Sequence, residues 1–168
     1  MQSMANTVLL RDVEASDLPI FFEQQLDPGA NVMAAFTAKN PADRQAFMAH
    51  WAQILGNGSN LNQTIILDGQ VVGNIASFIT EESGHREREV SYWIGKQYWG
   101  RGIATQALSL LLELLQERPL YARVAKDNGA SLRVLEKCGF RIIGEGSGFA
   151  NARNAEVAEW LLQLEAGA

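Results

Sequence analysis

Apolar residues in the first half of the chain form runs with the spacing of strands. Such runs predict strands at residues 7–13, 63–67 and 70–79. The last two are joined by Asp68-Gly69, a dipeptide that favours a two-residue hairpin turn with positive φ. A further strand is expected at residues 89–94, where one of two alternating sets would face the core: Val90, Tyr92 and Ile94, or Glu89, Ser91 and Trp93.

Other segments space their apolar residues three or four positions apart, which is typical of helices with one buried face. A first helix is expected through residues 18–26, with Ser16 and Asp17 as capping candidates and Asp27-Pro28-Gly29 as its stop. A second helix would run from Asn40-Pro41 to near Gly56. The most regular pattern, at residues 103–115, predicts a third helix that is closed by Pro119.

The remainder of the chain continues the alternation of strands and helices. A strand is expected at residues 120–125, a loop at 126–131, a short helix at 131–138 ending at Gly139, and a strand at 140–145. The strand, helix and strand between residues 89 and 125 imply a parallel crossover. Residues 156–164 fit a helix about as well as a strand. The expected fold class is therefore α+β, with antiparallel strands first and a β-α-β unit after them.

Length and composition agree with one ordinary globular domain. The chain has 168 residues, 47% of them hydrophobic, and a net charge of −5. This acidic balance provides no basic surface for nucleic acid or an anionic membrane, and no apolar stretch approaches the ~20 residues of a membrane span. The N-terminal residues lack the features of a signal peptide, and the single cysteine, Cys138, excludes an internal disulfide. We therefore expect a cytoplasmic protein.

Two glycines one residue apart, Gly100 and Gly102, stand between a predicted strand and a predicted helix. A helix N-terminus presents unpaired N–H groups and the positive end of the helix dipole, and glycines let a phosphate approach these donors closely. The alternative is a tight turn that only needs positive φ. The segment is not a Walker loop, because no Gly-Lys-Ser/Thr follows, and it lacks the third glycine and the acidic residue of a Rossmann fingerprint.

The segment QYWGRGIATQAL, residues 97–108, resembles the acyl-CoA pyrophosphate loop of the GNAT acetyltransferase superfamily, Q/R-x-x-G-x-G/A, at Gln97, Gly100 and Gly102. Together with KDNGASLRVLEKCGF, residues 126–140, it is similar to the RimJ/RimL branch of ribosomal-protein N-terminal acetyltransferases. The matching core covers about residues 89–146 of a single domain expected to span 1–168. The resemblance implies a GNAT-type acyl-CoA N-acyltransferase fold, a mixed central sheet flanked by helices, and it implies a strand at residues 156–164.

The same resemblance implies that acetyl-CoA binds as a co-substrate between two splayed parallel strands. Its pantetheine arm would pair with main-chain groups near Ile94 and Lys96 and with the side chain of Asn128. Its pyrophosphate would lie on the glycine loop and the first helical turn, at Gly100, Arg101, Gly102, Ile103, Ala104 and Thr105. The alternative for Asn128 is a simple turn held by an Asx bond.

Acetyl transfer from a thioester to an amine requires an unprotonated amine, a polarised carbonyl and a proton for the departing thiolate. Glu89 is the candidate base, acting through water, because its position matches a common carboxylate site in this branch; Glu87 and a solvated rim role for Glu89 are the alternatives. Many family members have a tyrosine acid directly before E-K-x-G-F, where this chain has Leu135. Ser131 is therefore the candidate acid, and thiolate release with little help is the alternative.

Other chemically interesting residues are expected to be structural. Cys138 would pack, because no histidine stands in a partner motif, and no metal is expected, because His50 and His85 show no ligand spacing. Five aromatic residues would either wall a substrate site or fill the core, with the core favoured for most of them: Phe36, Phe47, Trp51, Trp99 and Phe149.

The sequence predicts an acetyl-CoA-dependent N-acetyltransferase that acts directly on a primary amine, either a protein N-terminus or a small molecule. One rival is a non-catalytic acyl-CoA-binding or sensing protein of the same fold. A second rival is a nucleotide-binding module that uses the glycine loop for a different phosphate. The expected partner is the amine substrate, with no nucleic acid and no membrane, and a homodimer is left open.

Overall fold

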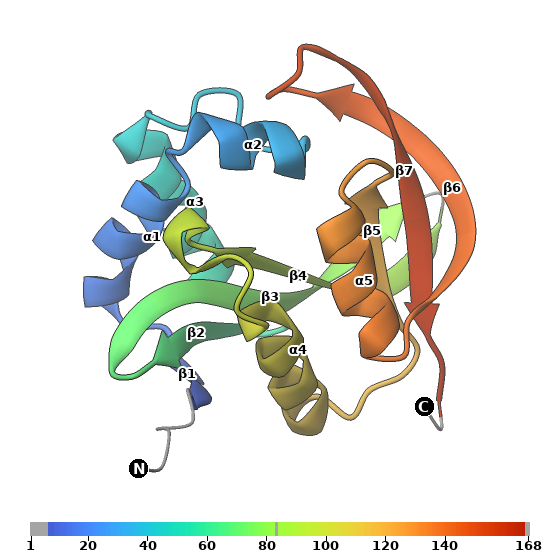
Figure 1. The fold of residues 1–168 in the computed structure, drawn as a ribbon, viewed down its shortest axis with the longest axis horizontal. Coiled ribbons are helices and arrows are strands. Elements are labelled where there is room, and N and C mark those ends of the chain that lie inside the picture. Colours follow the sequence, from blue (N-terminus) through green and yellow to red (C-terminus); the bar gives the residue numbers. More distant parts are fainter. Residues whose placement is uncertain (1–6, 83, 167–168) are drawn as a thin grey trace.

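The computed structural model describes residues 7–82 and 84–166. The expected domain, residues 1–168, extends beyond the described residues at both ends. Part of the signal-peptide expectation rests on residues 1–6, which also lie outside the described residues. Seven strands form one mixed sheet in the order β1-β2-β3-β4-β5-β7-β6 (Figure 1). The strands are β1 (Val8–Asp12), β2 (Leu61–Leu67), β3 (Gln70–Glu82), β4 (His85–Ile94), β5 (Leu120–Ala125), β6 (Arg141–Ala150) and β7 (Ala155–Leu164). The α-helices are α1 (Leu18–Gln24), α2 (Pro28–Ala34), α3 (Arg44–Leu55), α4 (Ile103–Leu114) and α5 (Gly129–Lys137).

The pairing of the strands confirms the expected fold class. Strands β1 to β4 pair antiparallel in succession, and β4 pairs with β5 in parallel after the crossover through α4. Strand β7 then lies between β5 and β6 and pairs antiparallel with both. This pairing on two sides makes residues 156–164 a strand, although their apolar spacing fits a helix equally well.

Helices cover both faces of the sheet (Figure 1). On one face, α4 packs its buried residues Ile103, Ala107, Leu108 and Leu111 into the same core as Val90 and Ile94 of β4. On the other face, α1 contacts β3, and the carbonyl of Gln24 accepts the indole N–H of Trp93 at 3.2 Å. The alternation predicted for residues 89–94 is therefore confirmed, with Val90, Tyr92 and Ile94 on the core face.

Several helix boundaries differ from the sequence expectations. Asp27-Pro28-Gly29 also starts α2, because the Asp27 carboxylate accepts the N–H of Ala30 at 2.7 Å and Pro28 takes the first helical position. Helix α3 begins after Asp43, whose carboxylate accepts the N–H of Ala46 at 3.0 Å, rather than at Asn40-Pro41. Helix α4 ends at Leu114, before Pro119 is reached.

Several strands are longer than their apolar patterns predict. The polar stretch after residue 79 was not assigned to a strand, yet β3 and β4 form a hairpin through it, with Glu81 opposite Arg86. Opposite charges on facing residues stabilise an antiparallel pair, so this end of the hairpin does not need apolar residues. Strand β6 likewise continues to Ala150, beyond the expected 140–145.

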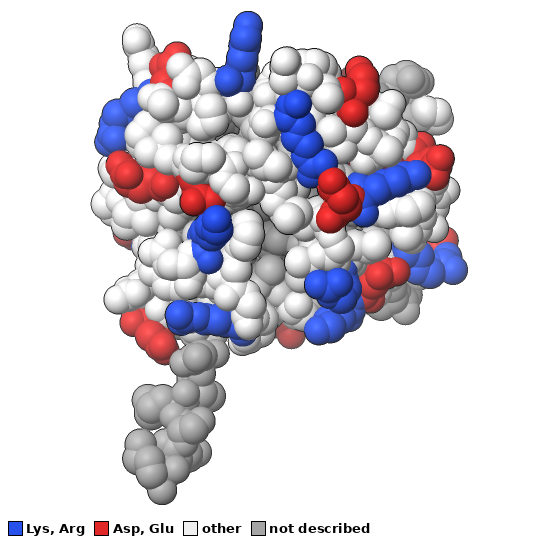
Figure 2. Space-filling view, turned by 45° about the horizontal axis from the view of Figure 1, so that its top comes forward, with Lys and Arg blue, Asp and Glu red and all other residues white. Residues whose placement is uncertain are grey.

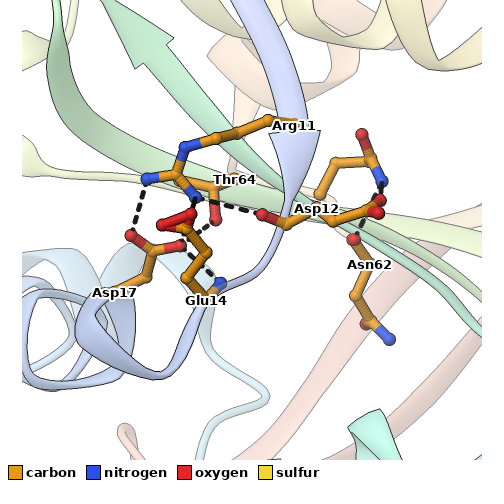
Figure 3. A network of polar contacts seen from close by, with 7 residues as sticks. Arg11, Asp12, Glu14, Asp17, Asn62 and Thr64 are labelled. Carbon is orange, nitrogen blue, oxygen red and sulfur yellow. Dashed lines mark hydrogen bonds and ion pairs between the residues drawn. The ribbon is translucent and has the colours of Figure 1, made fainter.

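A partly buried ion pair connects β1 to the segment that starts α1 (Figure 3). Arg11 on β1 donates two hydrogen bonds to the Asp17 carboxylate, at 2.7 and 2.8 Å. The hydroxyl of Thr64 on β2 donates a third at 2.7 Å, and the N–H of Glu14 donates a fourth at 2.9 Å. Asp17 is only 1% exposed. It stands at the N-cap position of α1 without a side-chain capping bond, because its carboxylate accepts the N–H of Glu14, the N-cap residue of the preceding 3-10 turn.

These contacts determine the ionisation of Asp17. Burial by itself would raise its pKa, but the hydrogen bonds from Arg11, Glu14 and Thr64 outweigh burial and hold the pKa at about 2. A carboxyl group whose pKa is lowered by folding stabilises the fold above its unfolded pKa, and this contribution is lost as the pH falls through the folded pKa. The size of the shift corresponds to roughly 2 kcal/mol at neutral pH.

We expect Asp17→Asn to lower the free energy of unfolding by roughly 2 kcal/mol at pH 7, because an amide cannot replace the ionised acceptor of Arg11. The difference in the free energy of unfolding between the variant and the wild type should shrink as the pH falls from about 4 to about 2, because the wild-type carboxylate becomes protonated in this range. Urea unfolding across this pH range measures the difference. Glu113→Gln, on the exposed face of α4, serves as the control. A deficit that stays constant down to pH 2 would contradict the assigned role.

Candidate active site

The sheet opens between its two parallel strands. Among the described residues, β4 and β5 are bridged only at Glu89 and Tyr121, whereas β3–β4 and β5–β7 pair along their lengths. Beyond the bridge, β4 continues to Ile94 and β5 to Ala125 with a gap between them. Unpaired main-chain N–H and C=O groups along a strand can bind the amides of an extended ligand as an added strand would.

The glycine loop leads from the end of β4 into α4. Gly100 and Gly102 have positive φ values of 79° and 75°, and a Cβ added to either would meet no atom within 4 Å. Gly102 occupies the N-cap position of α4, and the first helical hydrogen bond runs from the N–H of Gln106 to its carbonyl at 3.2 Å. The N–H groups of residues 103–105 precede that bond, so they have no acceptor within the helix. Positive φ and open space beside the backbone therefore occur together in this loop.

The residues beside the loop already make contacts of their own. The carbonyl of Ile94 accepts the indole N–H of Trp99 at 2.9 Å, and the carbonyl of Lys96 accepts the backbone N–H of Trp99 at 3.1 Å. The Lys96 ammonium lies 3.4 Å from Asp27 Oδ2, and the exposed Arg101 lies over the ring of Tyr98. A carbonyl oxygen has two lone pairs, so Ile94 and Lys96 keep one acceptor site each for a ligand amide.

A cavity of about 1120 Å³ lies against the gap. Strands β3, β4 and β5 form its floor, and α1, α3 and the segment after α2 contribute walls. Aromatic and amide side chains dominate its lining, among them Phe21, Phe36, Phe47, Trp51, Phe78, Trp93, Asn57, Asn60, Asn62 and Asn74. Of the five aromatic residues expected to wall a site or fill the core, Phe36, Phe47 and Trp51 line this cavity. The expectation of core packing is wrong for Phe36, Trp99 and Phe149, which are 39%, 44% and 54% exposed.

The β6–β7 hairpin encloses the cavity on a further side, and its tip reaches α2 (Figure 1). There, Arg153 donates from Nε to the carbonyl of Val32 at 2.8 Å, and Asn151 donates to the carbonyl of Thr37 at 2.8 Å. Arg153 also pairs with Asp127, and its hydrogen bond lowers the pKa of that carboxyl group. Because Asp127 lies in the loop before α5, the hairpin tip joins α2 to that loop.

Two buried carboxylates from distant strands converge on the cavity and share one guanidinium. Glu89 on β4 is 7% exposed and Glu159 on β7 is 5% exposed. Arg123 on β5 lies between them, with Nε 3.5 Å from Glu89 Oε1 and Nη1 3.1 Å from Glu159 Oε1. The hydroxyl of Thr80 donates to the other oxygen of Glu89 at 2.8 Å. Carboxylates at the edge of a cavity favour a cationic amine nearby.

The alternatives for the base occupy different environments. Glu87 projects to the same side of β4 as Glu89, but it lines a separate cavity of about 180 Å³ together with His85. Glu89 is buried and lines the large cavity, so it is not a solvated rim residue. The sequence analysis missed Arg123 and Glu159. In the sequence, each is only a single charged residue within a predicted strand, which does not indicate a site.

On the α5 side of the gap, two hydroxyl groups lie within hydrogen-bond distance. Tyr92 Oη and Ser131 Oγ are 2.7 Å apart, and both residues line the cavity. The Asn128 side chain caps α5 by accepting the N–H of Ser131 at 3.3 Å, which is the Asx bond of the alternative interpretation. Leu135, at the position of the expected tyrosine, is 2% exposed and lines the cavity without a hydroxyl group.

Cys138 packs between α4 and α5, with its Sγ 3.7 Å from the carbonyl of Thr105 and 3.7 Å from Ser109 Oγ. Burial raises the pKa of its thiol, which therefore keeps its proton at neutral pH. Within residues 7–82 and 84–166, no cluster of three or more His, Cys, Asp and Glu residues is arranged to hold a metal ion. None of the helices in these ranges has the length and apolar character that a membrane crossing requires.

On the face shown in Figure 2, basic and acidic side chains are interspersed around a mostly uncharged centre. No broad area of a single sign stands out on that face.

Residues 7–141 match the family of acetyltransferase (GNAT) domains. This match extends over most of the sequence, and the chain belongs to the GNAT acetyltransferase family. A curated relative, spermidine N(1)-acetyltransferase of Escherichia coli (strain K12), is 27% identical over 146 residues, which are 84% of this chain and 76% of that protein. The family expected from the glycine loop is thereby confirmed.

Solved structures also resemble this fold. Mycobacterium smegmatis RimJ in complex with CoA-disulfide superposes with a TM-score of 0.80 at 24% identity, over 96% of this chain and 83% of that chain. Ribosomal-protein-alanine N-acetyltransferase from Brucella melitensis superposes with a TM-score of 0.79 at 22% identity, over 94% and 99% of the two chains. These likenesses show the GNAT fold.

We expect Arg123→Met to destabilise the protein, because the change leaves two buried carboxylates without the cation that they share. Breaking a buried ion pair costs about 3–5 kcal/mol, and the partial exposure of Arg123 favours the lower end of this range. Urea unfolding at pH 7 measures the loss. Arg141→Met is the matched control, because Arg141 and Glu165 are both exposed and such pairs contribute little. Equal stability of the two variants would contradict the assigned role of Arg123.

Proposed function

We propose that this chain is a single-domain N-acetyltransferase that transfers the acetyl group of acetyl-CoA directly to a primary amine, on a protein N-terminus or a small molecule. The observation that carries the proposal is the gap between β4 and β5, which ends at the glycine loop and adjoins the large cavity. A long thioester with a pyrophosphate needs an anion site, a slot of main-chain groups and a separate space for the acceptor. The gap, the loop and the cavity offer these three features in that arrangement.

The proposed acetyl-CoA site uses the residues expected from the sequence. The pyrophosphate would lie beside Gly100 and Gly102, where the backbone faces open space, on the N–H groups of Arg101, Ile103, Ala104 and Thr105. Main-chain groups of Ile94 and Lys96 would bind the amides of the pantetheine arm. Asn128 uses its Oδ1 for Ser131, which leaves its NH₂ group to donate to a carbonyl of the arm.

Glu89 is the proposed base for the attacking amine. Thr80 and Arg123 orient its carboxylate at the cavity floor, and the carboxylates that line the cavity attract the amine as its ammonium form. Glu89 then accepts the ammonium proton, directly or through one water, and the neutral nitrogen attacks the thioester carbonyl. Glu159 lines the same cavity and is the second candidate for this role.

Ser131 is the proposed group for the departing thiolate. It lies in the first turn of α5, its hydroxyl faces Tyr92, and no hydroxyl stands at position 135. We also propose a cytoplasmic location, with which the single free thiol of Cys138 is consistent.

An acetylation screen tests the proposed function against its two rivals. Release of free CoA from acetyl-CoA would be followed with polyamines, peptides with a free N-terminus and small amines as acceptors. The proposal expects release that depends on one class of amine. A sensing protein would bind acetyl-CoA without release, and a nucleotide-binding module would prefer ATP or NAD to acetyl-CoA in parallel binding measurements.

We expect Gly102→Val to abolish most of the affinity for acetyl-CoA, because a branched side chain would occupy the space proposed for the pyrophosphate. The left-handed backbone at this position also strains any side chain, so strain must be separated from the loss of the anion site. Gly69→Val is the matched control, since Gly69 has the same left-handed conformation and the same open space in the β2–β3 turn. Calorimetry should find affinity lost in the first variant only. Unchanged affinity in Gly102→Val would refute the cofactor site.

We expect Glu89→Gln to lower kcat by about 10²–10⁴-fold at neutral pH while acetyl-CoA affinity is retained, because the amide cannot accept the ammonium proton. Higher pH should partly restore the rate, since more of the amine then arrives neutral. Glu159→Gln is the paired variant, because Glu159 lines the same cavity and contacts the same guanidinium. A near-normal rate in Glu89→Gln together with a large loss in Glu159→Gln would transfer the role of base to Glu159.

A further inference from the structure

A pair of hydroxyl groups lies on the opposite side of β4 from Glu89. Tyr92 projects from the core face of β4, and its hydroxyl oxygen lies 2.7 Å from Ser131 Oγ on α5. Glu89 projects from the other face of the same strand, three positions earlier. A thioester bound in the gap beside β4 would therefore have a carboxylate on its acceptor side and two hydroxyl groups on the side of α5.

The chemistry of the pair gives its hydrogen bond a direction. Burial raises the pKa of Tyr92, although its hydrogen bond with Ser131 lowers it in part, so the phenol keeps its proton at neutral pH. A phenol is a stronger donor than an aliphatic hydroxyl group, so Tyr92 donates and Ser131 Oγ accepts. Ser131 has one hydroxyl proton, and with Tyr92 as donor this proton is available to another acceptor in the cavity.

We propose that Tyr92 is a positioning residue that turns the Ser131 hydroxyl group toward the sulfur of the thioester. This role rests on the proposed function. As the amine nitrogen bonds to the acetyl carbon, the carbon–sulfur bond breaks and its electron pair stays on sulfur. Ser131 then donates a hydrogen bond to the thiolate, and Tyr92 strengthens this bond by donating to Ser131.

The protons of this step balance without ionising either hydroxyl group. The ammonium proton goes to Glu89 or to a water molecule, and Tyr92 and Ser131 keep their own protons. The thiolate leaves and takes up a proton from solvent. The pair thereby supplies the stabilisation of the leaving group that Leu135 cannot provide.

The pKa of the thiol group of bound CoA tests this role and can be measured without turnover. The pKa of the CoA thiol would be measured in the complex by the ultraviolet absorbance of the thiolate, for the wild type, Tyr92→Phe, Ser131→Ala and the double variant. We expect Tyr92→Phe to raise the pKa of the bound thiol by about one unit, the size of one hydrogen bond to a charged group. Ser131→Ala should raise it at least as much, and the double variant should equal Ser131→Ala, because Tyr92 acts through Ser131.

Kinetics and a control variant complete the test. Tyr92→Phe keeps the ring in the core, and its kcat should fall roughly tenfold with little change in the acetyl-CoA KM, as one pKa unit of lost stabilisation implies. Tyr121→Phe, whose hydroxyl accepts from Gln163 outside the cavity, should leave the thiol pKa unchanged. If CoA binds but its thiol pKa is the same in the wild type and Tyr92→Phe, or if the two substitutions are additive, the role of Tyr92 is refuted. If the wild type binds no CoA, the proposed function is refuted together with this role.

Discussion

The single bridge between Glu89 and Tyr121 is the constraint on which the site depends. Strand β4 is held along its length by β3, and β5 is held along its length by β7, so each strand follows a different neighbour. Among the described residues, the main chains of the two parts pair at one bridge, and the crossover α4 and the contact of Arg123 with Glu89 also connect the two parts. Main-chain groups that a regular sheet would use for pairing therefore stay available beside the cavity. The same bridge fixes Glu89 at the point where the gap begins.

The gap between β4 and β5 also has chemically different side chains on its two sides. On the acceptor side, the buried carboxylates of Glu89 and Glu159 would be costly to desolvate, and Arg123 offsets part of that cost by contacting both. On the α5 side, the residues at the gap are neutral hydroxyl groups, which hold their protons in a buried environment. A carboxylate and a pair of hydroxyl groups are thereby kept apart by the strand that carries both Glu89 and Tyr92. The hairpin tip that joins α2 to the α5 loop completes the enclosure of the acceptor side.

The sequence predicted the local features and missed those that require distant strands to meet. The glycine loop was predictable because Gly100 and Gly102 stand directly between a strand and a helix. The start of α2 was misjudged because Asp27-Pro28 can end one helix or cap the next, and only the acceptance of the Ala30 N–H distinguishes these roles. The contact of Arg123 with Glu159 depends on β7 inserting between β5 and β6, which no local pattern indicates. Tyr92 was predicted to alternate with Glu89, but its partner Ser131 lies on a helix 39 residues later.

The gap between β4 and β5 is tested most directly by a crystal structure of the protein with CoA. We predict that the pantetheine arm lies in the gap along β4, with the pyrophosphate on the N–H groups at the start of α4. The sulfur should lie between Glu89 and the Ser131 hydroxyl group. A structure in which CoA binds elsewhere and leaves the gap empty would contradict the central claim.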